Sequence, residues 1–493
     1  MRFLFKGVKQ LSENTENVVK ALPLRKDMFG RRMIFTSETA VTASNVANVV
    51  DQAYNTHLMN RSEIEYLWDY YKGKQPSLYR KRELRDDLTK HIVENRANEI
   101  VSFKTGFLVG KPVQYISSNA DKDVSDPVNK LNDAMRVIGK ATKDKQLVEW
   151  CMVGGVGYRY VAQNKDRFVR SPFNLYTLDP RNTFVIRAND YTQRVLAAVN
   201  YVTDENGQVT FTVYTDDMVY TFLKGSNRPV KKTVNAFGAI PIIEYPANNA
   251  RLGSFEIVLS LLDAINDFDC ARNEAVEQFV QSLLVLYNCQ VDEGTTADTI
   301  RQAGMILLKS MNGEKADVKN LSEQLDQSQN QTLKDDMYNT VLQIVGMPSQ
   351  GDGSTGDSSN NGAIVLKNGW QGAETRAEDF EAMFKLPETE MIQVVAILCN
   401  GLGDFSFDPA DLDIKFTRHS YDNLLSKSQT LTTMLASDKV HPKCAYEASG
   451  LFTDTEEAVK LGLEWYAQVK AEEQKQAAMA LKQKSEDVTG DEE

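Results

Sequence analysis

The pattern of apolar and polar positions separates helical from strand-rich stretches in the first half of the chain. Helical periodicity runs from Ser62 to a break at Gly73, and it returns over residues 86–108. Residues 158–243 instead carry short runs rich in Val, Tyr, Phe and Thr between turn residues, which predicts antiparallel strands. Residues 1–60 show little periodicity, and we expect them to form an adaptable N-terminal arm.

A long helical pattern opens the second half of the chain at Ser254. It continues for about 35 residues, more than most helices of globular proteins. Ser254 is placed to cap the free backbone N–H groups, and Glu256 to oppose the positive end of the helix dipole. Because its apolar residues occupy more than one face, several neighbouring elements must cover this helix. A turn-rich stretch over residues 290–330 separates it from a second helical pattern that ends at Gly346.

The remaining pattern predicts a loop, a helix, a strand and more helices, in that order. Gly, Ser, Asn and Asp dominate residues 349–362, a composition typical of a flexible loop. Residues 363–402 return to helical periodicity and contain Pro387, whose missing N–H predicts a kink. We expect a strand at residues 412–418 and helices over residues 420–485.

Charge and composition narrow the kind of protein. The formal net charge of −12 argues against a simple nucleic-acid binder, which needs a basic face to replace counterions along the phosphates. A role with DNA must therefore tolerate the duplex without gripping it. The acidic, polar residues 486–493 are expected to be a disordered tail. The five cysteines are scattered and odd in number, which suits a reducing cytosol, and we expect neither a secretory signal nor a membrane span.

Short motifs that resemble catalytic loops lack the required spacing. The string at residues 106–112 has three residues between its glycines where a phosphate-binding loop has four, and Pro112 stands where a hydroxyl should hold magnesium. We interpret it as a helix end followed by a turn. The glycines at 154, 155 and 157 precede a strand, so they indicate a tight turn or a close backbone approach rather than a dinucleotide site. No metal-binding or nucleophile spacing surrounds the histidines, which we expect to be structural or exposed: His57, His91, His419 and His441.

Carboxylates spaced along the pattern that begins at Ser254 allow two interpretations. They could form a metal or acid/base cluster, because several are four residues apart. We favour the polar face of one long helix, because no histidine or second carboxylate motif lies near them in the sequence. The residues concerned are Asp263, Asp267, Asp269, Glu274 and Glu277. The sequence therefore predicts neither a cofactor nor a metal.

Three motifs resemble those of the siphovirus-type portal proteins of tailed bacteriophages. A YY-x-GK element is followed by a G-[YF]-x-x-GKP-x-x-Y element, here formed by Tyr70, Tyr71, Gly73 and Lys74, then by Gly106, Phe107, Gly110, Lys111, Pro112 and Tyr115. The stretch from Phe237 to Asn266 resembles the family's entry into its first stem helix. GMPSQG followed by NNGAIVLK resembles a third family element, although Asn361 replaces the usual Ser. The likeness extends over about residues 60–450.

The resemblance implies an α+β fold of several regions, with a mixed α/β wing, long stem helices, a small α/β clip and a helical crown. The regions would be the N-terminal arm (1–60), the wing (61–253), the first stem helix (254–289), the clip (290–330), the second stem helix (331–347), the tunnel loop (348–362), a kinked long helix with a return strand to the wing (363–419), the crown (420–485) and the disordered tail (486–493).

The function implied by the resemblance is that of a non-enzymatic ring subunit in the virion. About twelve copies would form a channel at one capsid vertex, through which DNA is packaged and ejected. The implied partners are other copies of the chain, the terminase, the head-to-tail adaptor, the major capsid and scaffolding proteins, and DNA passing without sequence specificity. Assembly would take place in the bacterial host cytoplasm, without a membrane.

Three groups of residues are candidates for this function. The tunnel loop would line the narrowest part of the DNA channel with Asp352, Asp357, Asn360 and Asn361. The stem would present carboxylates to the channel, with candidates Asp263, Asp267, Glu274 and Glu277. The clip would dock terminase and adaptor through Thr295, Thr296, Asn312, Glu314 and Lys315.

Two other functions remain open at this point. The chain could be another structural protein of the phage head or connector, which imaging of ring order and size would distinguish. It could instead be an enzyme of DNA packaging, such as a nuclease or NTPase. The missing phosphate-binding and metal motifs argue against the enzyme, and turnover of ATP or DNA by the purified protein would support it.

Overall fold

The computed structural model divides the chain into two compact units, which are described separately below. The first comprises Met1–Trp68, Glu99–Glu256 and Gly346–Glu493, and the second comprises Asp69–Asn98 and Ile257–Val345. The structure describes residues 30–81, 89–118, 125–165, 171–226, 228–280, 283–287, 289–290, 309–310, 317–321, 327–349, 369–402, 405–418, 424–437, 439–452 and 455–489. Helices and strands are mixed in it, as the predicted α+β class requires.

A six-stranded sheet packs against helix α2 (Val46–Tyr71) in the first unit. Its strand order is β1-β5-β6-β7-β8-β9, and only the β1–β5 pair is parallel. Apolar side chains of α2 and the sheet, such as Val50, Tyr54 and Phe211, form one buried core. The strands are β1 (Phe35–Thr36), β5 (Thr183–Ala188), β6 (Val195–Thr203), β7 (Val209–Tyr214), β8 (Met218–Leu223) and β9 (Lys231–Val234).

Part of the expected N-terminal arm belongs to this core. The helix expected from Ser62 begins at Val46, and Ile34 and Val41 are buried beside it. Val46, Val49, Val50, Ala53 and Tyr54 follow the i, i+3, i+4 spacing of an amphipathic helix, a signal that the prediction of an arm overlooked. Residues 30–60 are thus folded with the strand-rich region.

A second sheet in the same unit has the order β10-β3-β4 and is antiparallel. Its strands are β10 (Ile242–Pro246), β3 (Val156–Gln163) and β4 (Phe173–Leu178), and helix α5 (Lys140–Gly154) leads directly into β3. The turn between them is Gly155, with φ +79°, where an added Cβ would lie 2.1 Å from the carbonyl oxygen of Arg251. The glycine cluster is therefore a tight turn with a close backbone approach, as predicted.

Helix α10 (Trp370–Leu402) packs against the second sheet and continues through Pro387. It is followed by β15 (Leu412–Lys415), within the expected strand 412–418, which pairs with β2 (Gln114–Ser117). Helices α3 (Arg96–Val109) and α4 (Ser125–Val137) flank β2 in the chain. Chain segments nearly 300 residues apart thus meet in one sheet, a pairing that local pattern does not encode.

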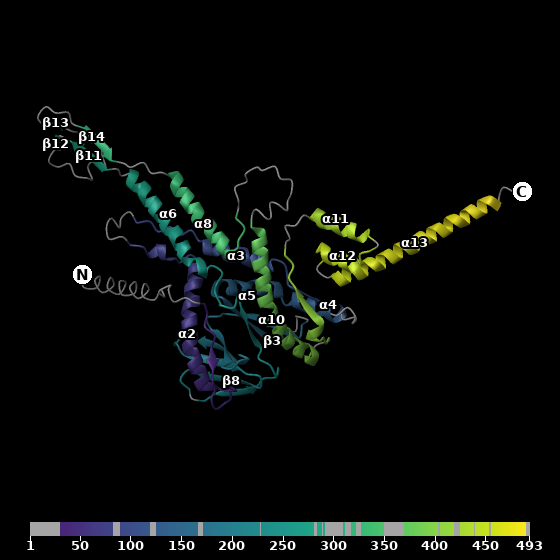
Figure 1. Cartoon of the computed structure of the whole chain (residues 1–493). Coiled ribbons are helices and arrows are strands. Elements are labelled where there is room, and N and C mark those ends of the chain that lie inside the picture. The colour runs from purple at the N-terminus through teal and green to yellow at the C-terminus, as the bar shows by residue number, and fades with distance from the viewer. Residues whose placement is uncertain are drawn as a thin grey trace. The chain divides into compact units, whose positions relative to one another are not determined.

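Three helices fill the predicted helical stretch 420–485. They are α11 (Leu424–Leu435), α12 (Pro442–Ser449) and α13 (Thr455–Thr489), the last a single long helix (Figure 1). His441 caps α12, because its Nδ1 accepts a hydrogen bond of 3.1 Å from the backbone N–H of Lys443. Large apolar side chains of α13 are exposed in the single chain: Leu461, Leu463, Trp465 and Tyr466.

Two helices dominate the second unit and lie side by side (Figure 1). These are α6 (Leu259–Val280) and α8 (Gln327–Val345), which ends at Gly346 as expected. Between them in the chain lie two short antiparallel pairs: β11 (Leu283–Tyr287) with β14 (Asp317–Leu321), and β12 (Cys289–Gln290) with β13 (Lys309–Ser310).

The first of these helices is shorter than the sequence pattern indicated. The expected helix over residues 254–289 starts with a 3₁₀ turn at Glu256–Val258 and ends at Val280. Residues 283–287, LLVLY, form a strand instead, because a short apolar run fits either structure and pairing with β14 decides between them. The Ser254 hydroxyl has no hydrogen-bond partner in the described chain, and Glu256 accepts from the backbone N–H of Gly253 instead.

Candidate functional site

The four predicted stem carboxylates lie on α6 and differ in exposure. Asp267 is exposed, and its carboxylate makes no hydrogen bond or ion pair with another described residue. Asp263 accepts a 3.0 Å hydrogen bond from the hydroxyl of Tyr70. Glu274 is buried and accepts from the backbone N–H of Lys90, at 3.0 Å. The side chain of Lys90 lies 2.5 Å from Glu277.

A lysine joins the two long helices of the second unit. Lys334 of α8 lies 3.0 Å from Asp269 of α6 and 2.8 Å from Glu94. Burial and the hydrogen bond with Glu94 raise the pKa of Asp269, since two carboxylates at one site resist double ionisation. Close by, the guanidinium of Arg96 stacks 3.9 Å above the ring of Tyr338. This cluster fastens the helix pair.

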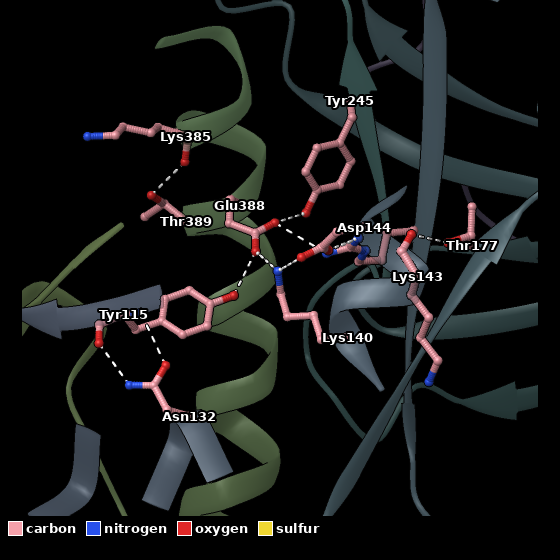
Figure 2. A network of polar contacts seen from close by, with 11 residues as sticks. Tyr115, Asn132, Lys140, Lys143, Asp144, Thr177, Tyr245, Lys385, Glu388 and Thr389 are labelled. Carbon is pink, nitrogen blue, oxygen red and sulfur yellow. Dashed lines mark hydrogen bonds and ion pairs between the residues drawn. The ribbon is translucent and has the colours of Figure 1, made fainter. Parts of the chain in front are cut away.

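A buried charge network connects five elements of the first unit (Figure 2). The Lys140 ammonium lies 2.6 Å from Asp144 and 2.8 Å from Glu388. The Arg159 guanidinium completes a ring of charges, at 2.5 Å from Asp144 and 3.4 Å from Glu388. The side chains of all four are at most 3% exposed. Two cations thus balance two anions away from water.

Two tyrosines complete the hydrogen bonds of Glu388. The hydroxyl of Tyr115 on β2 donates to one carboxylate oxygen at 2.7 Å, and that of Tyr245 on β10 donates to the other at 2.8 Å. Glu388 on α10 thereby contacts groups from α5, β3, β2 and β10 (Figure 2). One carboxylate holds the long helix to both neighbouring sheets.

Three members of this network, Glu388, Tyr115 and Tyr245, have pKa values far from pH 7. Burial alone would raise the pKa of Glu388, but Lys140 and Arg159 outweigh it and lower that pKa to about 2. Burial and the Glu388 charge raise the pKa of Tyr115 and Tyr245 well above the usual value. Because Glu388 and the two tyrosines do not titrate near pH 7, they suit fastening rather than acid–base catalysis.

Sequence reasoning missed this network, apart from Tyr115 as part of a motif. Its members are dispersed over 274 positions, and a charged residue in a helix or strand ordinarily faces solvent. One signal was present in the sequence. Arg159 lies in an otherwise apolar strand, VGYRYV, on the side that the structure shows to be buried.

The remaining predicted site residues lie outside the described part of the chain. This holds for the tunnel-loop residues Asp352, Asp357, Asn360 and Asn361, and for the clip residues Thr295, Thr296, Asn312, Glu314 and Lys315.

The motifs that were set aside on spacing have structural positions. At the end of α3 an added Cβ on Gly110 would lie 2.2 Å from the carbonyl oxygen of Gly106, so this string is a tight helix end as predicted. His57 is buried and stacks on Phe184, with ring centroids 4.6 Å apart. Its Nε2 is hydrogen-bonded to the carbonyl of Arg181. His419 lies outside the described residues.

Within the described ranges, no three His, Cys, Asp or Glu side chains gather in a way that could hold a metal ion. None of the helices described is both long and apolar enough to cross a membrane.

The described charged clusters all fasten helices and strands, and long helices keep apolar side chains exposed, so the class of protein is a structural subunit of a larger assembly. The chain belongs to the phage portal protein family, SPP1 Gp6-like, whose sequence profile matches residues 51–484. This family comprises structural proteins of the virion.

Solved structures and curated proteins add the following. One similar chain comes from the neck of an empty GTA particle with C6 symmetry, with 12% identity and a TM-score of 0.42. Another comes from the neck of a native GTA particle with C12 symmetry, with 13% identity and the same TM-score. In both cases the match covers 72% of this chain and 90% of the other. Among curated proteins, none matches the sequence significantly.

Proposed function

We propose that about twelve copies of this chain form a closed ring at one capsid vertex, the channel through which phage DNA is packaged and ejected. The observation that carries the proposal is the match to the portal family over residues 51–484. On this proposal the chain is not an enzyme, and a separate ATPase drives the DNA.

Exposed apolar side chains on the paired helices support assembly with other copies. Ile257 is 51% exposed at the entry to α6, and Val276 on α6 is 41% exposed. On α8, Leu333 is 51% exposed and Ile344 is 37% exposed. A single chain leaves these side chains in water, whereas neighbouring helix pairs in a ring would bury them, at about 25 cal/mol per Å² of apolar area removed from water.

Repulsion between carboxylates and phosphates would keep the channel from gripping the duplex. Among the stem candidates we assign this role first to Asp267, because the other three carboxylates contact residues 70–90 of their own chain. We further propose that the tunnel-loop residues named above line the narrowest part. Shortening residues 351–360 should then impair DNA packaging or retention in an assembly assay, and unchanged packaging would contradict this role.

The clip, residues 290–330, is proposed to dock the terminase during packaging and the head-to-tail adaptor afterwards. Charge reversal at Glu314 and Lys315 should reduce terminase binding to the assembled ring, and unaltered binding would reject these two residues as contacts. Major capsid and scaffolding proteins are the further proposed partners, in the host cytoplasm where the shell assembles.

Single-particle electron microscopy of the purified full chain tests the central proposal. Closed rings with a central hole and about twelve subunits are expected. Monomers, open filaments or shells at micromolar concentration would overturn the portal assignment in favour of another head or connector protein. Steady ATP or DNA turnover by the same preparation would favour the packaging enzyme instead.

A further inference from the structure

A cavity in the first unit is lined by two cations that make no ion pair with a described residue. It measures about 500 Å³ and is lined by α3, by α10 and by the backbone that follows β10. Phe103, Lys104 and Phe107 come from α3, Arg376 and Phe380 from α10, and Asn248 from the connecting segment. Apart from the two cations and Asp379 of α10, the lining is apolar, aromatic or neutral polar.

Lys104 has no partner in the described chain. It is half-buried, and it makes no hydrogen bond or ion pair with another described residue. Burial and the nearby Arg376 guanidinium lower the pKa of Lys104 to about 8. Lys140 and Lys334, by contrast, each lie within 3.0 Å of two carboxylates. Desolvating an ammonium without a counter-charge is unfavourable, and none of the residues that the structure describes supplies that counter-charge to Lys104.

Arg376 is positioned toward the same cavity by the backbone beneath it. Gly346 has φ +69°, and a Cβ there would lie 2.1 Å from Cδ of Arg376, so the side chain lies directly over this glycine. Arg376 also lacks an ion pair with any described residue. Glu374 and Glu381 of the same helix are both engaged by Arg418, and Asp379, which also lines the cavity, makes no ion pair with either cation. Neither cation therefore has a paired acid among the described residues.

Aromatic rings line one side of the cavity. Phe103 and Phe107 are stacked with centroids 5.7 Å apart, and Trp370 lies beside them, 6.0 Å from the first and 6.1 Å from the second. Apolar rings lower the local dielectric and would strengthen an ion pair formed beside them. A concave, partly apolar cavity lined by the half-buried Lys104 and the exposed Arg376 fits an inserted side chain better than the convex phosphate backbone of a duplex.

We propose that this cavity receives a carboxylate side chain from a second copy of the chain, which pairs with Lys104 and Arg376. The inference rests on the proposed ring, in which each copy adjoins another. Charge complementarity favours this occupant, because the chain carries 68 acidic and 56 basic residues and every neighbouring copy offers surplus acid. The cavity is therefore a subunit contact that forms only on assembly.

Zero-length crosslinking on the full-length protein tests the contact directly. Rings would be assembled from equal amounts of ¹⁴N- and ¹⁵N-labelled chain and treated with a carbodiimide, which joins an amine to a carboxylate in contact with it. Mass spectrometry should find Lys104 joined to an acidic peptide of the other isotope. If Lys104 in assembled rings gives no crosslink between copies, the inference is wrong.

The variant Lys104→Met provides a second measurement. The single chain should melt at the same or a higher temperature, because an uncompensated buried charge is removed, whereas ring assembly should need about tenfold more protein. Lys145→Met, at an exposed position of α5, is the matched control and should change neither property. If Lys104→Met assembled at the wild-type concentration, the proposed contact would be wrong. If this variant assembled normally but lost DNA binding, the cavity would bind a phosphate instead. Failure of the wild-type chain and of the control to form rings would refute the ring itself.

Discussion

Replacing Glu388 with Gln tests what the buried network contributes to the first unit. The substitution keeps the shape and some hydrogen bonds of the side chain but removes its charge. Lys140 and Arg159 then share only Asp144, so one buried positive charge is left uncompensated. Breaking a buried ion pair on one side costs about 3–5 kcal/mol. The pKa of Glu388, lowered from 4.5 to about 2, corresponds to a similar contribution of about 3 kcal/mol at neutral pH.

Hydrogen–deuterium exchange of α10 measures this loss where it occurs. Amides around Met391 and Ile392, which are buried in the wild-type chain, should exchange about a hundredfold faster in Glu388→Gln at pH 7. Glu378→Gln, on an exposed position of the same helix, is the control and should change exchange little. Equal exchange in the two variants would refute the view that this carboxylate fastens the helix.

A double substitution tests the charge balance of the same network. Adding Lys140→Met to Glu388→Gln leaves Arg159 and Asp144 as a neutral pair, so the double variant should be more stable than the sum of the single losses. The pH dependence also has a definite sign. Because the pKa of Glu388 is lowered on folding, its contribution is present above about pH 4.5 and is lost as the pH falls toward 2.

Two further predictions concern other buried positions of the first unit. Burial and the Arg61 charge lower the pKa of His57 from 6.5 to about 4, so the unfolded chain binds the proton first, and acidification from pH 7 to 5 should cost about 2 kcal/mol that His57→Gln abolishes in pH-dependent melting curves. An unchanged slope in His57→Gln would contradict the assignment. Gly155→Ala should destabilise by more than about 2 kcal/mol because its Cβ meets a carbonyl, whereas Gly207→Ala, with similar φ but open space, should cost about 1 kcal/mol. Equal losses of melting temperature in the two variants would show that backbone strain, and not the clash with the carbonyl, sets the cost.

The network also bears on the proposed channel. Helix α10 follows the predicted tunnel loop in the chain, and Glu388 holds this helix to β10, β3 and β2. We expect DNA passing through the ring to push on the loop, so a rigid attachment of the following helix would keep the opening at a constant position. Packaging by the Glu388→Gln chain would measure this effect.

Local pattern predicted several parts of the fold well. Glycines marked the ends of α3 and α8 and the tight turn at Gly155, because a side chain at these positions would clash or strain the backbone. Alternating Val, Tyr and Thr predicted the strands over residues 158–243, and amphipathic spacing predicted α11 to α13. The portal motifs around Tyr70 and Gly106 led to the family that the whole-chain comparison established.

Pairing between distant segments was beyond local pattern. LLVLY at residues 283–287 became a strand because residues 317–321 pair with it. The helical spacing from Val46 was present in the sequence, but the sheet that this helix covers was not. The assignment of stem carboxylates had the same weakness. Spacing grouped Asp267 with Glu274, yet one is exposed and the other is buried against Lys90.

The amino-acid sequence alone determined the family, the order of helices and strands, and the absence of recognisable catalytic motifs, because these depend on short motifs and local periodicity. The tertiary structure alone decided which charges are buried together. Glu388, Arg159 and Lys140 form a network, and Lys104 pairs with none of the residues described, because burial and pairing depend on chain segments that meet only after folding.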